Sequence, residues 1–155
     1  MDAIDHRILA ALQEDSALST ADLADRVGLS PTPCWRRVRQ LETAGYIRKR
    51  VALLDRDLLG VGTTVFVSIR TKTHAADWLT KFAKVVQSMP EVIEFHRMSG
   101  DIDYLMKVVV PDIPAYDAFY KRLISAIDLS DVSSSFAMEE IKATTTLPLT
   151  YLKQA

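Results

Sequence analysis

The sequence has little of what several classes of protein require. It contains a single cysteine, Cys34, so no disulfide can form within one chain, and we expect a reducing compartment, the cytoplasm. No apolar run approaches the ~20 residues that a membrane-spanning helix needs, so we predict no membrane association. The N-terminus lacks a basic start followed by an apolar stretch, which argues against a secretory signal peptide.

Motifs that would indicate an enzyme or a metal centre are also missing from the sequence. It has no glycine-rich phosphate-binding loop and no nucleophile elbow. The three histidines are scattered over separate segments and lack the spacing of metal ligands. We therefore predict a protein that is not an enzyme and that holds no metal and no cofactor.

What is present fits a soluble globular chain with unevenly distributed charge. Of the 155 residues, 48% are hydrophobic and 25% charged, and the length suits one large domain or two small ones. The overall charge of −1 argues mildly against DNA binding. However, residues 30–50 carry six basic side chains against Glu42 alone, whereas residues 1–29 are acidic. A local basic block indicates a phosphate partner, although a solvated helix face is the alternative.

Three helices are predicted in the first 45 residues. The first runs from about residue 2 to residue 14, where apolar residues recur at helical spacing. The second begins at Ser19 or Thr20, both good caps, and ends at Gly28. The third begins at Ser30, followed by a proline at the first helical position. A short helix, a tight turn and a third helix are typical of a helix-turn-helix in a domain spanning residues 1–50.

The third predicted helix has one apolar face, formed by Cys34, Val38 and Leu41, and one basic face. Such a helix fits the major groove, and arginine can form paired hydrogen bonds with guanine. Residues 46–54 look like a strand, basic at its start, that serves as a wing or as a linker over residues 51–61. The residues predicted to contact double-stranded DNA are Ser30, Thr32, Pro33, Trp35, Arg36, Arg37, Arg39, Gln40, Arg48, Lys49 and Arg50.

The remainder, residues 62–155, has the order strand, helix, strand, strand, helix, strand. The predicted strands are 63–70, 92–98, 102–110 and 132–144, and the helices lie near 74–88 and 114–127. This order is typical of the ferredoxin-like βαββαβ fold, so the fold class of the chain is α+β. Alternating positions are apolar on both sides of some strands, while two helices can cover only one face. Self-association through the other face is therefore expected.

Several segments resemble the Lrp/AsnC, or feast/famine, family of transcriptional regulators. They are residues 30–42 (SPTPCWRRVRQLE), 44–47 (AGYI), 99–104 (SGDIDY) and 136–142 (FAMEEIK), in the expected order. The resemblance covers nearly the whole chain. It implies homodimers that assemble into octamers or similar rings, and small-molecule effectors, usually amino acids, bound between the C-terminal domains. The C-terminal segments look most like a branch concerned with cysteine detoxification, which implies cysteine as the effector.

The resemblance also implies which residues would bind the effector. They are Met98, Ser99, Gly100, Asp101, Asp103 and Tyr104 in one loop, with Ser134, Ser135 and Phe136 on the far wall. A turn glycine exposes N–H groups to a carboxylate, and an aspartate can pair with an α-ammonium.

For several of these residues an ordinary structural role is the alternative. Asp101 and Asp103 are equally typical of a turn, and Tyr104 suits the core of a sheet. Cys34 lies on the apolar stripe, which favours packing over redox sensing. Trp35 fits either a DNA contact or a packing role. For the whole chain, an architectural DNA-binding protein without a ligand is the main alternative function.

Overall fold

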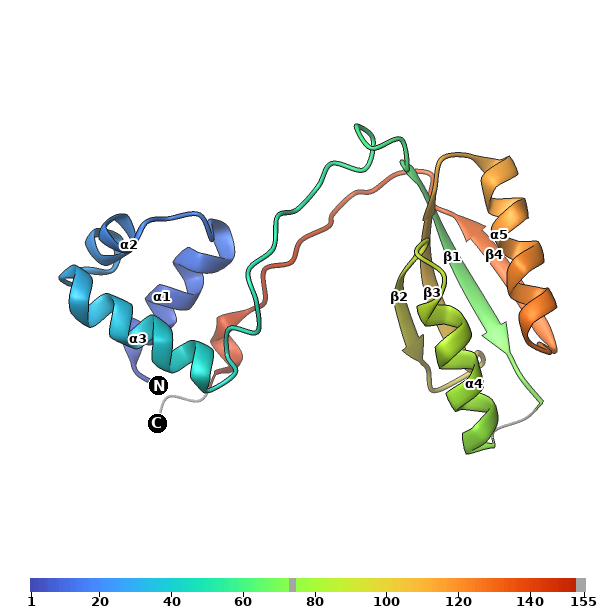
Figure 1. Ribbon diagram of the computed structural model, residues 1–155, viewed down its shortest axis with the longest axis horizontal. Coiled ribbons are helices and arrows are strands. Elements are labelled where there is room, and N and C mark those ends of the chain that lie inside the picture. Colours follow the sequence, from blue (N-terminus) through green and yellow to red (C-terminus); the bar gives the residue numbers. More distant parts are fainter. Residues whose placement is uncertain (73–74, 153–155) are drawn as a thin grey trace. The chain divides into compact units, whose positions relative to one another are not determined.

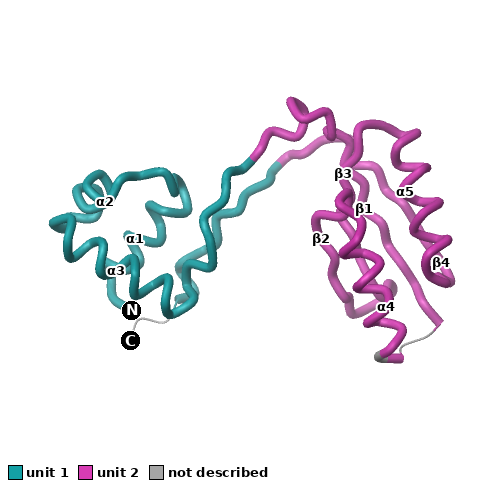
Figure 2. The backbone as a smooth tube through the Cα atoms, viewed as in Figure 1, with its two compact units in different colours: residues 1–53, 142–155 teal, residues 54–141 magenta. Residues whose placement is uncertain are grey.

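The computed structural model describes residues 1–72 and 75–152, which form two compact units. The first comprises residues 1–53 and 142–155, and the second comprises residues 54–141 (Figure 2). The end of the predicted C-terminal domain, 62–155, packs with the N-terminal helices in this division of the chain. Within the described ranges no helix is long and apolar enough to cross a membrane.

The first unit contains the three predicted helices, α1 (Ala3–Glu14), α2 (Thr20–Val27) and α3 (Pro31–Thr43) (Figure 1). The Ser19 hydroxyl accepts the N–H of Asp22 at 3.1 Å and so caps α2. Gly28 ends that helix with φ +70°, a left-handed conformation that favours glycine. A short turn at Gly28 and Leu29 then leads into α3, as the sequence predicted.

The C-terminal segment belongs to the core of this first unit. Leu147 exchanges two hydrogen bonds with the Gln13 side-chain amide: its N–H donates at 2.7 Å and its carbonyl accepts at 3.3 Å. Leu149, in the short 3-10 helix η1 (Leu149–Tyr151), and Leu152 then pack against the apolar core of the helices. The fully buried members of that core include Ile8 and Cys34.

The predicted strand at residues 46–54 does not form. Residues 48–54 have no regular secondary structure, and Val51, Leu53 and Leu54 are more than half exposed. Their β-branched and leucine side chains suit a strand, but a strand also needs a paired neighbour to satisfy its backbone groups. Among the described residues none provides a ladder for this segment.

The second unit is a four-stranded antiparallel sheet with two helices and confirms the ferredoxin-like prediction. Its elements are β1 (Thr63–Arg70), α4 (Ala76–Gln87), β2 (Val92–Arg97), β3 (Tyr104–Val110), α5 (Ile113–Ala126) and β4 (Asp131–Phe136). The strand order is β2-β3-β1-β4. The predicted start of α4, residue 74, lies outside the described residues.

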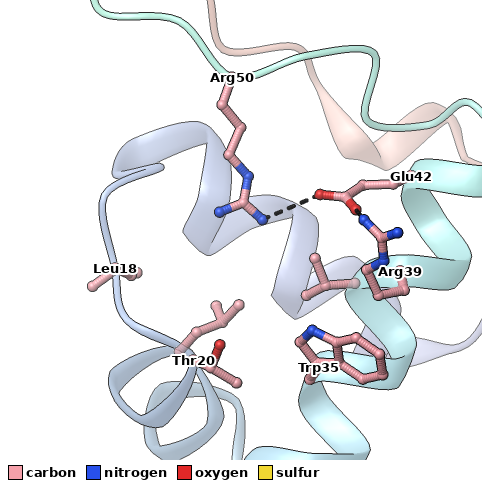
Figure 3. Close-up of a pocket in the computed structure, with 8 residues that line it drawn as sticks. Leu18, Thr20, Trp35, Arg39, Glu42 and Arg50 are labelled. Carbon is pink, nitrogen blue, oxygen red and sulfur yellow. Dashed lines mark hydrogen bonds and ion pairs between the residues drawn. The ribbon is translucent and has the colours of Figure 1, made fainter.

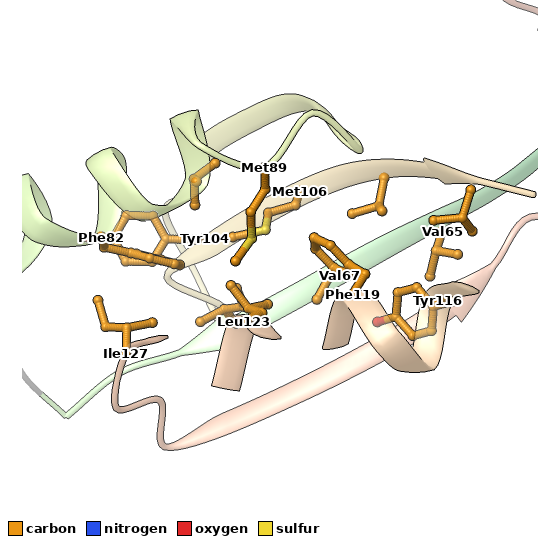
Figure 4. Packing of buried hydrophobic residues seen from close by; sticks show 14 residues of the cluster. Val65, Val67, Phe82, Met89, Tyr104, Met106, Tyr116, Phe119, Leu123 and Ile127 are labelled. Atoms are coloured by element: carbon orange, nitrogen blue, oxygen red, sulfur yellow. The ribbon is translucent and has the colours of Figure 1, made fainter. Parts of the chain in front are cut away.

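Both helices cover the same face of the sheet (Figure 1). Alternate residues of β1 and β3, such as Val67 and Met106, are fully buried on this face. They pack against Phe82 of α4 and against Phe119 and Leu123 of α5 (Figure 4). The burial of β3 changes at every residue, as expected of a strand with one face against the helices.

The opposite face of the sheet is not covered by a helix. Phe66 points to it with 39% of its surface exposed, and Leu105 and Val109 of β3 share the same face. β4 ends at Phe136, eight residues before the predicted strand end at 144. The pairing register explains why β4 ends early. Phe136 pairs with Val65, and β1 begins only two residues before Val65, so residues after Phe136 have almost no strand left to pair with.

Candidate DNA interface and effector site

The outward face of α3 holds the side chains that sequence analysis assigned to the major groove. Thr32, Arg36 and Gln40 are exposed, and Arg39 is 63% exposed at its side chain. Arg36 forms no ion pair with any described residue. The opposite stripe, including Cys34, is buried as predicted, and burial raises the pKa of the Cys34 thiol. A buried neutral thiol is a packing residue rather than a reactive one.

In this structure Arg37 does not have the role of the DNA contact that the sequence predicted. Its guanidinium pairs with the carboxylates of Asp2 at 2.8 Å and Asp5 at 2.7 Å, and its side chain is only 29% exposed. The hydrogen bonds that the guanidinium donates to Asp5 and Asp2 raise the pKa of Arg37. The residue therefore joins α3 to the start of α1 and is not free to bind DNA in this structure.

Glu42 engages two more of the predicted DNA-binding arginines. Its Oε2 lies 3.0 Å from Nη1 of Arg39 and its Oε1 lies 3.5 Å from Nη2 of Arg50 (Figure 3). Arg50 also donates to the carbonyl of Ser16 at 3.5 Å. Arg48 and Lys49 are exposed, and no ion pair joins either to a described residue. The basic block therefore contains both paired and unpaired cations.

Two shallow hollows flank the exposed face of α3. One, of about 290 Å³, is lined by Leu18, Thr20, Leu23, Trp35, Val38, Arg39, Glu42 and Arg50 (Figure 3). The other, of about 310 Å³, is lined by Leu29, Pro33, Arg36, Arg37 and Gln40. Trp35, for which packing and DNA contact were equally open, lines the first hollow with 53% of its surface exposed. Ser30 precedes α3 and is exposed, but its side chain makes no capping bond.

The predicted effector loop joins β2 to β3. Met98, Ser99, Gly100 and Asp101 are exposed, and Gly100 has φ +114°, which side chains rarely adopt. The backbone carbonyl of Asp101 accepts a hydrogen bond from Nε of Arg70 at 2.7 Å. Asp101 itself is exposed. Such a turn presents backbone groups and one carboxylate to solvent.

Two residues of the same loop have structural roles. The Asp103 side chain accepts the N–H of Thr71 at 2.8 Å, and its own N–H donates to the Ile69 carbonyl. Tyr104 is 3% exposed and packs among Trp78, Phe82 and other rings of the core. The predicted effector role is therefore not supported for the Tyr104 side chain, because it points toward the helices.

The predicted far wall lies on β4. Ser134 and Phe136 point to the helix side of the sheet, where both contact Tyr116 of α5. The Tyr116 hydroxyl hydrogen-bonds the Ser134 hydroxyl, and burial raises the pKa of Tyr116. Ser135 points to the uncovered face. Tyr116 was not among the predicted site residues, and the only signal for it in the sequence is the polar hydroxyl on a core-facing side chain.

The loop and the far wall lie at opposite ends of the sheet within one chain. Tyr104 pairs with Ile69, whereas Phe136 pairs with Val65 on the other side of the same strand. Four residues of strand span about 13 Å, and two strand spacings add about 10 Å across the sheet. One chain therefore does not bring both sets of predicted residues together around one small molecule.

Comparisons with known proteins agree with this architecture. Residues 1–48 match the model of a winged helix-turn-helix DNA-binding domain, and residues 64–147 match the Lrp/AsnC ligand-binding domain. The chain is 51% identical over 150 residues to the DNA-binding transcriptional activator DecR of Escherichia coli, covering 96% of this chain and 99% of DecR. It is 50% identical to the glutamate uptake regulatory protein of Zymomonas mobilis, covering 96% and 91% of the two chains.

Solved structures give the same result over the full length. An AsnC family transcriptional regulator from Agrobacterium tumefaciens superposes with a TM-score of 0.96 at 61% identity, covering 99% of this chain and all of that one. The regulator NMB0573 of Neisseria meningitidis, solved as an L-Met complex, superposes with a TM-score of 0.94 at 38% identity, covering 99% of both chains. The chain described here belongs to the Lrp/AsnC family of DNA-binding transcriptional regulators.

Proposed function

We propose that this regulator reads its operator with the outward face of α3 and that an amino acid modulates this binding. The observation that carries the DNA-reading part is Arg36, an exposed arginine on α3 without an ion-pair partner among the described residues. An unpaired guanidinium can form paired hydrogen bonds with guanine in the major groove. Thr32 and Gln40 lie on the same face and would make polar contacts with neighbouring groups of the DNA.

The DNA-reading proposal is tested on a duplex selected from a random pool with the wild-type protein. Arg36→Ala should weaken binding by about 1–3 kcal/mol if the side chain reads a base. Arg26→Ala, on α2, removes the same charge from a residue that already pairs with Glu14 and serves as the control. Unchanged operator affinity in the Arg36 variant would show that the assigned face of α3 is wrong.

We propose further that the effector binds between copies of the C-terminal unit. The turn around Gly100 and Asp101 would come from one copy, and the end of β4 at Phe136 from another. The support is the separation of these two sets along β1 in a single chain. Backbone N–H groups of the turn would bind the α-carboxylate, and Asp101 would pair with the α-ammonium.

The uncovered face of the sheet supports assembly into homodimers, and the family resemblance implies that these build octamers or similar rings. Phe66, Leu105 and Val109 present apolar surface there, and a second copy of the same face is the simplest cover. Light scattering after size exclusion measures the assembly. Phe66→Asp should reduce the oligomer to a smaller species, whereas an unchanged mass would place the interface elsewhere.

The effector proposal is tested by thermal unfolding with each of the standard amino acids. Cysteine is the first candidate on sequence resemblance, and methionine and glutamate appear in the names of relatives. A ligand at 100 times its Kd should stabilise the protein by about 2.7 kcal/mol. Asp101→Asn should abolish the shift, and Asp128→Asn, which alters another exposed carboxylate of the same unit, should not. No shift with any amino acid would favour the alternative, an architectural DNA-binding protein without a ligand.

A further inference from the structure

Glu42 is the only acidic residue in the basic block of residues 30–50, and it lies on α3 itself. Each of its two carboxylate oxygens holds a different guanidinium, Arg39 from the preceding turn of α3 and Arg50 from the segment after the helix (Figure 3). One carboxylate therefore occupies two cations that sequence analysis assigned to DNA.

These two pairs differ from the pair that holds Arg37. The Arg37 side chain is 29% exposed and Asp5 only 15%, so that bridge belongs to the packing of α1 against α3. The side chains of Arg39 and Arg50 are 63% and 41% exposed. Exposed ion pairs are weak in water and are screened by salt, so a well-placed phosphate can displace the carboxylate.

We propose that Glu42 is a specificity-determining residue that masks Arg39 and Arg50 from the phosphates of non-cognate DNA. A guanidinium already paired with a carboxylate must give up that pair before it binds a phosphate, so its net gain on arbitrary DNA is small. On the operator, the contacts made by α3 hold the backbone close enough for the exchange. Glu42 thus lowers non-specific affinity more than operator affinity. This inference rests on the proposed approach of α3 to DNA.

If Glu42 instead positioned Arg39, removal of the carboxylate would affect operator binding and random-DNA binding differently. If the carboxylate held Arg39 in the orientation that reads a base, its removal would weaken operator binding and leave arbitrary DNA unaffected. The two roles are therefore separated by comparing binding to a random-sequence duplex with binding to a duplex selected by the wild-type protein.

The test uses Glu42→Gln, which keeps the shape of the side chain and removes its charge. Binding is measured by fluorescence anisotropy between about 50 and 200 mM salt, because each phosphate contact contributes about −0.9 to the slope of log K against log salt. For the random duplex we expect several-fold tighter binding and a slope steeper by up to about two units per bound domain. The ratio of operator to random affinity should fall.

Glu14→Gln is the matched control, because it removes the same charge from a surface pair with Arg26 that involves neither α3 nor the segment after it. It should leave the salt slope unchanged. Arg50→Gln should hardly alter the slope in the wild-type background, but should lower it by about one unit in the Glu42→Gln background. Circular dichroism confirms that each variant is folded.

An unchanged slope for Glu42→Gln, equal to that of Glu14→Gln, would overturn the masking role. So would weaker operator binding with unchanged random binding, since that result belongs to positioning. Failure of the proposed DNA-reading face has its own signature, which is wild-type operator affinity in the Arg36→Ala variant. The Glu42 variants do not affect that measurement.

Discussion

Two neighbouring arginines on α3 should respond differently to replacement by glutamine: Arg37→Gln should lower the stability of the first unit, and Arg36→Gln should lower the affinity for DNA. Arg37 bridges Asp2 and Asp5 at 2.8 and 2.7 Å, and its removal leaves the largely buried Asp5 carboxylate without its cation. The loss of two charge-assisted hydrogen bonds at a half-buried site should cost about 1–2 kcal/mol. Arg36 is exposed and without an ion pair among the described residues, so its replacement should change stability by less than about 0.5 kcal/mol.

Thermal unfolding followed by circular dichroism measures the first effect. If the N-terminal unit unfolds as its own transition, 1 kcal/mol lowers its Tm by about 4–8 °C. Operator binding well below that temperature measures the second effect, where Arg36→Gln should lose affinity and Arg37→Gln should keep the wild-type salt slope. A Tm unchanged by Arg37→Gln, or a salt slope reduced by it, would refute the bridging role and restore the phosphate contact.

Three further predictions concern the first unit. Gly28→Ala should destabilise it by about 1–2 kcal/mol in denaturant unfolding, because φ is +70° although no atom would obstruct the added Cβ; an unchanged midpoint would contradict the strain argument. The thiol of Cys34 should react with an aromatic disulfide reagent only as fast as the unit opens, since it is fully buried and its pKa is raised; fast labelling of the native protein would contradict this. The pKa of Asp2 is lowered from its ordinary value of 3.8, chiefly by the N–H of Asp5. The stability that this carboxylate adds to the fold is therefore fully present above pH 3.8 and is lost as the pH falls through the folded pKa. The difference in Tm between wild type and Asp2→Asn should therefore shrink on acidification, and a constant difference would exclude the carboxylate as its source.

Periodicity and capping predicted most of the fold because they depend on near neighbours. The Ser19 cap, the Gly28 stop and the buried stripe through Cys34 all act within one or two turns of a helix. The alternation in β3 is equally local, since each residue alternates between covered and uncovered faces. The order of these elements then sufficed for the ferredoxin-like arrangement.

The errors arose where a distant partner decides the outcome. The apolar segment at residues 48–54 lacks a neighbouring strand, and β4 ends where β1 no longer extends beside it. The C-terminal segment packs with the N-terminal helices because Gln13, more than a hundred residues away in sequence, matches the backbone of Leu147. Tyr104 was ambiguous for the same reason, because only the packed sheet shows which face of β3 the helices cover.

The basic block illustrates the same limit for the DNA interface. Its charge was counted along the sequence as if every cation faced solvent, yet folding places carboxylates beside three of the six. Asp2 and Asp5 pair with Arg37 where that side chain is mostly buried, whereas Glu42 pairs with Arg39 and Arg50 at exposed sites that a phosphate can reach. The acidic N-terminal segment is thus partly a structural complement of α3. A charge count along the chain is therefore an upper bound on what this helix-turn-helix offers to phosphate, and the carboxylates that fold against it set the actual value.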